Sequence, residues 1–500
     1  MNRNQDIFTQ TGFLIKTILK PIVTRHPRLY RFACQIRTAC QELICPTENG
    51  FKPPPEHDTP PSPNSLPPVE NEPDRIEKLP RWLIREWQAI HEIEPLLFPD
   101  IGAEMTVTPE NINPVAEIYA SLSGQLGDHV THILLVPWLD RGGADLAAIH
   151  YVEAIFHTGA NPRVAVIATA NADSPWASKL PDQASFIEFG KAACQLHADD
   201  QEILLVRLLL QSSPGVIHNV NSRLGYDVFV RFGLALSHGS RLYMSVFCSD
   251  FTPEGRAIGY ATEYLPRLFD RLTAVSVDNA TFLEKLVQLY ALDRDKLHLH
   301  YQPANFSPLQ KEIGRRRKQR LNILWAGRID HQKRPDILIE IIHACKNFPF
   351  HFHIYGASVL NRDVYSDKLA GCENATYYGL FDGLSSLPME TFDVFLYTSQ
   401  WDGIPTILLD AISLQLPVVA SSVGGIGELI QTGHTGFAIE PFDSIMAYVN
   451  ALVYIHQNPD GVWALVQNAC QIVFSRHSWQ QFDTQVLSFP GYITDHHEIL

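Results

Sequence analysis

The sequence contains no C-x-x-C pair among its eight cysteines. Without such a pair, zinc-knuckle and thioredoxin-like sites lose their support. Cys248 and Cys345 lie in apolar runs and are expected to be buried as small hydrophobic residues. This cysteine usage fits a reducing, cytosolic compartment. The eight cysteines are Cys34, Cys40, Cys45, Cys194, Cys248, Cys345, Cys372 and Cys470.

Positive charge and long apolar runs are also scarce. The 39 Lys and Arg residues against 54 Asp and Glu give a formal net charge of −15. Nonspecific nucleic-acid binding needs clustered Lys and Arg, so no nucleic-acid partner is expected. No apolar run reaches the ~18–20 residues that a membrane span requires, and the N-terminus lacks a signal-peptide pattern. A cytoplasmic protein is therefore expected.

The composition changes along the chain. Five hundred residues predict two or three domains, and an apolar content of 45% is typical of a folded protein. Residues 1–45 are basic and amphipathic, and include the apolar stretch FLIKTILKPIV. Such a segment could lie on an anionic membrane surface, at the inner face of the membrane. Gly12 and Pro21 interrupt its helical pattern, so a partner-binding or disordered tail remains open.

A linker and a helical extension follow. Residues 46–80 hold eleven prolines, which predict an extended linker rather than a folded unit. Residues 81–129 form a helical extension in which apolar residues recur at helical spacing. We expect its first helix to pack on the domain that follows. The apolar residues with this spacing are Trp82, Leu83, Trp87, Ile90 and Ile93.

From residue 130 onward, short apolar runs alternate with helical segments. The runs HVTHILLVPW, NPRVAVIAT, PGVIHNV, RLYMSVFC and LTAVSVD form one series. The runs LNILWAGR, FHFHIYGA, ATYYGL, DVFLYTS, LPVVASS and GFAIEP form a second. Strands separated by helices predict an α/β fold with parallel sheets. We expect two Rossmann-like, doubly wound domains that face a cleft, over residues 130–305 and 306–477, with a C-terminal helix and tail, 478–500, packing back on the first.

Three motifs at predicted strand ends carry polar or glycine residues. In LDRGGAD, Gly142 and Gly143 precede a helix start that offers free N–H groups to an anion, although a plain tight turn is an equal reading. In AGRIDHQK, Arg328 and Lys333 lie near a helix N-terminus, which is unfavourable unless an anion lies between them. A solvated basic loop is the alternative, since Arg334 follows directly.

The third motif is TSQWDGIPTILLDAISLQLPVVASSVGG. Asp402 precedes a helix start and suits either a capping role or ligand binding. Asp410 lies within an apolar helix, where a carboxylate is costly unless backbone donors or ligand hydroxyls satisfy it. Downstream, Gly424 and Gly425 form a second glycine turn before a helix.

The order of these motifs resembles that of the family 4 retaining glycosyltransferases of GT-B fold (glycosyl transferases group 1). The resemblance runs through G-G, G-R-x-x-x-x-K, acid-G-x-P-x-x-x-x-x-acid-A and P-V-V-A-S-x-x-G-G-x-x-E, over roughly residues 130–485. It implies that the first domain binds the acceptor and the second binds a nucleotide-sugar donor. Arg328 and Lys333 would grip the donor diphosphate, Asp402 would touch the sugar, and Asp410 would bind the ribose. In PGVIHNVNSRLG, His218 is expected at a strand end that faces the cleft, where the resemblance implies contact with the sugar, although a core or loop histidine is an equal reading. The other implied donor-binding residues are Gly142, Gly143, Gly327, Gly356, Gly379, Gly403, Ile404, Pro405, Thr406, Gly424 and Gly425.

The implied activity is transfer of a sugar from a nucleotide-diphosphate sugar to a hydroxyl acceptor with retention of anomeric configuration. No cofactor and no essential metal are expected, and the partners are the donor and a glycan or lipid-linked acceptor of bacterial surface polysaccharide or glycolipid synthesis. Three alternatives remain: a non-catalytic GT-B protein that binds nucleotide sugar or glycan, a nucleotide-sugar epimerase, and a starch- or glycogen-type synthase.

The sequence departs from the family at both carboxylates. Asp402 and Asp410 stand where the family's E-x7-E motif has glutamates, so each carboxylate reaches about 1.3–1.5 Å less far. Either the helix lies closer to the donor, a water bridges the gap, or the activity has decayed.

Overall fold

The computed structural model describes residues 81–95, 114–127, 129–159, 161–252, 254–304, 319–358 and 365–493. The basic segment 1–45 and the proline-rich segment 46–80 lie outside these residues. The described residues contain no helix that combines the length and the apolar character needed to cross a bilayer. Membrane contact through residues 1–45 stays a prediction.

A seven-stranded parallel sheet forms the centre of the first half of the described chain, in the order β3-β2-β1-β4-β5-β8-β9. The strands β1, β2 and β4 are buried along their whole length. Helices cover both faces of a parallel sheet and leave no face for polar side chains, which explains the continuous apolar runs of the sequence. The strands are β1 (His132–Val136), β2 (Val164–Ala168), β3 (Ser185–Ile187), β4 (Val216–Val220), β5 (Arg241–Val246), β8 (Ala274–Val277) and β9 (Leu297–Leu299).

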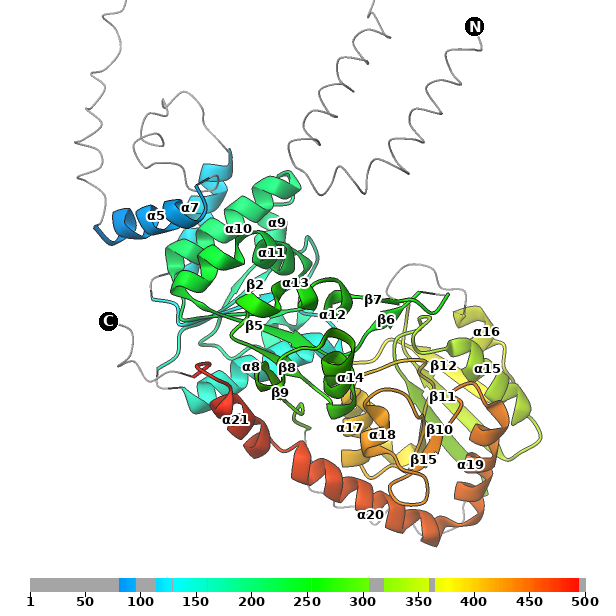
Figure 1. Cartoon of the computed structure of the whole chain (residues 1–500). Coiled ribbons are helices and arrows are strands. Elements are labelled where there is room, and N and C mark those ends of the chain that lie inside the picture. The colour runs from blue at the N-terminus through cyan, green and yellow to red at the C-terminus, as the bar shows by residue number, and fades with distance from the viewer. Residues whose placement is uncertain are drawn as a thin grey trace, which may run out of the picture. The chain divides into compact units, whose positions relative to one another are not determined.

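A second parallel sheet of six strands follows, in the order β12-β11-β10-β13-β14-β15. Each of its strands lies within one of the six apolar runs of the second series. The two doubly wound, Rossmann-like sheets confirm the expected fold class (Figure 1). The strands are β10 (Leu321–Ala326), β11 (Phe350–Tyr355), β12 (Ala375–Gly379), β13 (Val394–Tyr397), β14 (Val418–Ser421) and β15 (Phe437–Ile439).

Four short strands were not expected from the sequence. β3 and β9 have three residues each, and β6 (Asp250–Phe251) and β7 (Ala257–Ile258) form a small antiparallel hairpin. Segments of two or three residues carry no readable period of their own. β15 is as short as β3 and β9, and only its apolar run GFAIEP indicated it.

Helices surround both sheets. Those of the first half are α5 (Arg81–Ile93), α7 (Pro114–Leu126), α8 (Gly143–Thr158), α9 (Phe189–Ala192), α10 (Ala198–Ser212), α11 (Arg223–Gly239), α12 (Tyr260–Glu263), α13 (Leu265–Leu268) and α14 (Ala280–Tyr290). Those that follow are α15 (Pro335–Ala344), α16 (Ser366–Ala370), α17 (Thr406–Ser413), α18 (Ile426–Leu429), α19 (Ile445–Gln457), α20 (Pro459–Arg476) and α21 (Trp479–Ser488).

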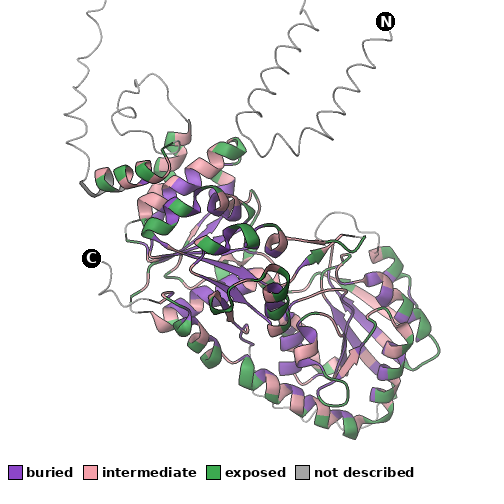
Figure 2. Ribbon diagram, viewed as in Figure 1, coloured by how far each residue is buried: buried purple, intermediate pink, exposed green. Residues whose placement is uncertain are grey.

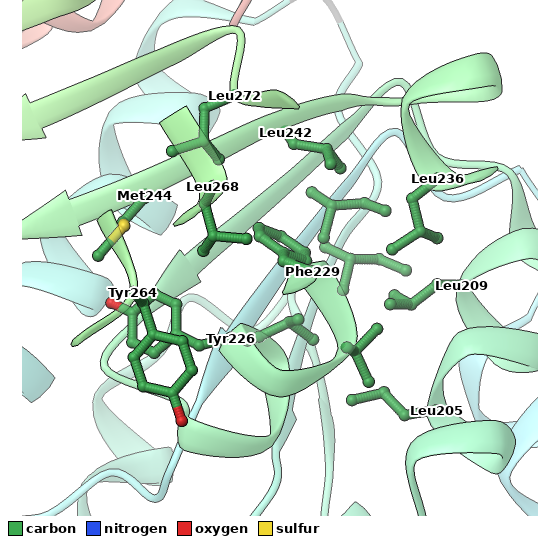
Figure 3. Close-up of a cluster of buried hydrophobic side chains, with 14 of the residues drawn as sticks. Leu205, Leu209, Tyr226, Phe229, Leu236, Leu242, Met244, Tyr264, Leu268 and Leu272 are labelled. Carbon is green, nitrogen blue, oxygen red and sulfur yellow. The ribbon is translucent and has the colours of Figure 1, made fainter. Parts of the chain in front are cut away.

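The core of the first half lies between its sheet and helices α10, α11 and α13. Figure 3 shows the ring of Phe229 among Leu205 and Leu209 of α10 and Leu242 of β5. Helix α5 joins the same core, because Ile90 is buried in it and Trp87 packs against it. The buried residues concentrate on the strands of each sheet and on the inner faces of the helices (Figure 2).

The C-terminal helices connect the second half back to the first. α20 leads from the second sheet to α21, which packs against α8 beside the first sheet (Figure 1). Phe482 of α21 is fully buried, and the carbonyl oxygen of Tyr492 lies 2.8 Å from His132 Nε2. The last turn of the described chain is thus part of the first domain's core.

Candidate functional site

A cavity of about 1530 Å³ is lined by residues of both halves. The lining residues follow the carboxyl ends of β1, β5 and β8 in the first sheet and of β10, β11 and β13 in the second. In both sheets the strand order reverses beside β1 or β10, which is where ligands bind in open α/β sheets. The volume exceeds the roughly 300–1,000 Å³ of ordinary ligand pockets, so it has room for two small ligands.

Lys333 and Asp402 form the centre of the second half's share of the cavity. Lys333 lies in the loop between β10 and α15, and its ammonium contacts the Asp402 carboxylate and the Tyr397 hydroxyl. Tyr397 donates a hydrogen bond of 2.7 Å to the same Asp402 oxygen, and Ser399 donates one of 3.3 Å. Lys333 is only 9% exposed, so the pair is largely withdrawn from water. Burial and the Asp402 charge raise the pKa of Tyr397 well above its usual range, which keeps its hydroxyl a donor.

The three cations of the GRIDHQKR loop have different surroundings. Arg328 lines the cavity, half exposed, with its Nε 3.2 Å from Asp330 and its Nη2 donating to Gln332 at 2.8 Å. Arg334 lies outside the cavity lining and pairs with Asp336 at 2.6 Å. The loop is therefore not a uniformly solvated basic loop, because one cation is buried in the cavity and another lines it.

Asp410 lies on α17 with its carboxyl in the cavity wall. α17 begins at Thr406, after Pro405 as its N-cap, and buries Leu408 and Leu409 behind Asp410. Burial raises the pKa of the Asp410 carboxyl to about 6. Asp410 lines the cavity, and within the described part of the chain no hydrogen bond or ion pair holds its carboxyl.

The glycine loops let two strand ends approach closely. Gly356 follows β11 with φ +146°, and a Cβ there would collide with the carbonyl oxygen of Gly327. Gly327 and Gly356 both line the cavity, so only glycine at position 356 permits this wall. Across the cavity, a Cβ on Gly143 would lie 3.8 Å from Thr406 Oγ1, which brings the helix start of α8 near that of α17.

Twelve of the residues that the sequence indicated line this one cavity. They are Gly142, Gly143, Gly327, Arg328, Lys333, Gly356, Asp402, Gly403, Ile404, Pro405, Thr406 and Asp410.

His218 does not face the cavity, so that expectation was wrong. It lies within β4 rather than at its end, and it is fully buried. Its ring nitrogens lie 2.8 Å from the Tyr492 hydroxyl and 2.8 Å from Ser245 Oγ. Burial lowers the pKa of His218 to about 3, so it is a neutral histidine of the core.

Three predicted glycines support the cavity from behind instead of lining it. Gly379 accepts a hydrogen bond of 2.7 Å from the Gly356 N–H. Gly424 has φ +51°, and a Cβ there would collide with the carbonyl oxygen of Asp402. A Cβ on Gly425 would lie 2.7 Å from Asn279. The glycine turn therefore leaves space for the Asp402 loop.

Sequence reasoning missed several cavity residues. Burial raises the pKa of Asp145 to about 7 and that of Asp278 to about 8, so at neutral pH Asp145 is about half protonated and Asp278 is largely protonated. Asp278 directly follows β8 at the carboxyl edge of its sheet, a signal that could have been read, whereas Asp145 lies in the first turn of α8. Cys248, expected to be buried, is only partly buried and lines the cavity beside Asp250.

A second set of contacts joins the two halves outside the cavity lining. Glu428, the acid at the end of the glycine-turn motif, accepts hydrogen bonds of 2.8 Å from the N–H and the hydroxyl of Thr281. It also accepts one of 2.8 Å from the Tyr301 hydroxyl. This motif acid thus holds the first half against the second.

The described residues include no group of three or more His, Cys, Asp or Glu side chains placed to hold a metal ion. The cavity lining itself carries charged and polar groups. It offers two cations to an anion, a free carboxyl to hydroxyl donors, and glycine-lined backbone at strand ends.

Comparison with known proteins matches residues 320–458 to the family described as Glycosyl transferases group 1. An uncharacterized 41.2 kDa protein of a Klebsiella pneumoniae cps region is 26% identical over 252 residues, which cover 47% of this chain and 68% of that protein. The Escherichia coli O-antigen biosynthesis glycosyltransferase WbnH is 25% identical over 222 residues, which cover 44% of this chain and 58% of WbnH. The chain thus spans between about half and two thirds of these relatives.

Two solved structures share the architecture. Anabaena HepE in complex with UDP and glucose matches with a TM-score of 0.57 and 17% identity, covering 72% of this chain and 98% of HepE. The pneumococcal O-GlcNAc transferase GtfA in complex with UDP and GlcNAc gives 0.56 and 13%, covering 72% and 98%. This likeness establishes the GT-B fold, and the resemblance to group 1 glycosyltransferases is confirmed, while family 4 stays a prediction.

Proposed function

Because residues 320–458 form a Glycosyl transferases group 1 domain on a GT-B fold, we propose that this chain is a glycosyltransferase that uses a nucleotide-diphosphate sugar. The observation that carries the proposal is that Lys333, Asp402 and Asp410 line the same cavity as the glycines Gly327 and Gly356 at the strand ends. In that cavity Arg328 and Lys333 bind the diphosphate, Asp410 accepts the ribose hydroxyls, and Asp402 accepts a hydroxyl of the sugar.

Transfer occurs to a hydroxyl acceptor with retention of anomeric configuration, and Arg328 and Lys333 stabilise the diphosphate charge that develops as the glycosidic bond breaks. No metal is required for that role, since two cations already face the site. The acceptor is a glycan or lipid-linked sugar of bacterial surface polysaccharide synthesis, which the O-antigen relative supports. In the free site Lys333 is bound to Asp402, so the arriving diphosphate must compete for its ammonium.

A thermal-shift screen with UDP-, GDP- and ADP-sugars tests the donor class. A sugar nucleotide at about 100 times its dissociation constant is expected to add about 2.7 kcal/mol to the stability of the protein. A stabilised protein that also transfers the sugar to glycan acceptors is the expected result. Stabilisation without transfer would instead support the alternative of a non-catalytic GT-B binding protein, and no stabilisation by any donor would contradict the proposed function.

Replacing Asp410 with alanine is expected to weaken donor binding about 10- to 100-fold, because each hydrogen bond to a charged group contributes about 1.5–3 kcal/mol. Isothermal titration with the donor found in the screen measures the change. Asp367→Ala, an exposed acid on α16, is the matched control and should bind like the wild type. Equal affinity in Asp410→Ala and wild type would show that the shorter carboxylate does not reach the donor.

A further inference from the structure

Asp278 reaches from the first half of the cavity to the loop that carries Asp402. It follows β8 directly and is only 6% exposed. One of its carboxyl oxygens accepts a hydrogen bond of 2.6 Å from the Asn279 side chain. The other accepts the backbone N–H of Ile404 at 3.3 Å, and Ile404 belongs to the second half. The carboxyl of Asp278 also lines the cavity.

Gly403 leaves the space that the Asp278 carboxyl occupies. A Cβ on Gly403 would lie 2.7 Å from one oxygen of Asp278 and 3.0 Å from the other, closer than ordinary van der Waals contact. The same Cβ would lie 2.9 Å from the carbonyl oxygen of Phe247. Only a residue without a side chain lets the Asp278 carboxyl lie against the backbone between Asp402 and Ile404.

A second carboxylate of the first half holds the start of the same loop. Trp401 donates its indole N–H to Asp250 at 3.2 Å, and its ring packs against Phe251 with centroids 5.5 Å apart. The loop 401–404 is therefore held at one end by Asp250 of β6 and at the other by Asp278, which follows β8. The place of Asp402 depends on these contacts between the halves as much as on its own domain.

We propose that Asp278 is a positioning residue for the donor: it holds the Gly403–Ile404 backbone and thereby places the Asp402 carboxylate against the sugar. This inference rests on the proposed function, because it assumes that a nucleotide sugar occupies the cavity. Asp278 acts through Asp402 and need not touch the sugar itself.

The ionisation of Asp278 gives this role a distinct signature. Burial raises the pKa of Asp278 to about 8, so the carboxyl is neutral at pH 7 and gains a charge as the pH rises. That charge would appear beside Asp402 and near the anionic donor, and should weaken donor binding. The titratable groups that face Asp278 are Asp402, Glu428, Cys248, Tyr151 and Tyr301. Burial raises the pKa of the thiol and of both phenols, so their charge does not change near pH 8.

The test compares donor affinity in Asp278→Ala, Asp278→Asn and wild type between pH 7 and pH 9. The probe is whichever of UDP-glucose, GDP-mannose and ADP-glucose stabilises the wild type most. Asp278→Ala is expected to raise the dissociation constant about tenfold at pH 7, the cost of one lost buried hydrogen bond. Asp278→Asn keeps the acceptor oxygen and should lose less than Asp278→Ala. The dissociation constant of the wild type is expected to rise above pH 8, and that of Asp278→Asn should not.

Ser276→Ala is the matched control, because Ser276 is buried on the same strand and bonds Ser245 away from the cavity. It should bind the probe as the wild type does, even if its thermal midpoint falls. A wild-type affinity in Asp278→Ala, or a pH dependence unchanged in Asp278→Asn, overturns the positioning role alone. A folded wild type that binds none of the three probes overturns the proposed function and, with it, this inference.

Discussion

Replacing Lys333 with alanine is expected to lower the turnover of sugar transfer about 10²- to 10³-fold, which corresponds to about 3–4 kcal/mol of lost transition-state stabilisation. The physical reason is the position of its ammonium, which is buried in the cavity and already aligned by Asp402 and Tyr397. A preorganised cation in a water-poor site stabilises a developing diphosphate charge more than a flexible surface cation does. Initial rates with saturating donor measure the loss.

Lys346→Ala is the control for this variant. Lys346 is exposed and pairs with Glu373 at 3.0 Å outside the cavity lining, so its removal should leave turnover unchanged. Removing Lys333 also leaves Asp402 without its cation, although Tyr397 and Ser399 still donate to it. The thermal midpoint of Lys333→Ala must therefore be measured beside its rate. Turnover within a fewfold of wild type would contradict the assignment of Lys333.

The two sheets could be predicted well from the sequence, because strands buried in a parallel sheet consist of continuous apolar runs. β10, β11 and β13 are such runs, and the glycines and cations that follow them lie where a strand-end rule places them. The order of elements therefore predicted most of one wall of the cavity, including Lys333 and Asp402.

His218 shows where that rule fails. The run PGVIHNV predicted a strand end at the histidine, yet β4 continues to Val220. A shift of two residues along a strand separates the rim of a cavity from the core of a sheet. The partners of His218, Ser245 and Tyr492, come from distant parts of the chain, and no local pattern could have indicated them.

Asp278 illustrates the opposite error. In VSVDNATFLEKL the segment has the form of a helix start, and Asn279 does cap α14 by accepting the Phe282 N–H at 2.8 Å. This helix start accounts for the polar residues of the segment, so the sequence gives no separate sign of a role for the Asp278 carboxyl. Asp278 lies against Gly403 of the second half. This contact depends on how the two halves face each other, and a single sequence does not contain that information.

Lowering the pH from 7 to 5 is expected to destabilise the protein by an amount on the order of 3 kcal/mol. Five histidines are buried around the contact of α8, the first sheet and the C-terminal helices: His132, His150, His218, His300 and His477. Burial lowers the pKa of each of them to about 3 or 4. In the unfolded chain their pKa returns to about 6.5, so the unfolded state binds more protons below that pH.

Three carboxyls act in the opposite direction. Burial raises the pKa of Asp410 to about 6, of Asp145 to about 7 and of Asp278 to about 8. These groups hold protons in the folded state that the unfolded state releases, so their contribution to stability is present at low pH and is lost as the pH rises through these values. The histidines outnumber them between pH 5 and 6.5, and the carboxyls prevail above pH 7. Stability should therefore be greatest near pH 7.

Urea denaturation at pH 5, 6 and 7 measures this dependence, and His218→Gln tests its origin. Each buried histidine contributes up to about 1.4 kcal/mol per pH unit to the slope, so the variant should lose that share between pH 5 and 6. His434→Gln, an exposed histidine, should keep the wild-type slope. A free energy of unfolding that stays constant from pH 7 to 5 would mean that these histidines take up protons in the folded protein. Since His218 has hydroxyl partners on both ring nitrogens and no carboxylate, the folded protein offers little to stabilise that charge.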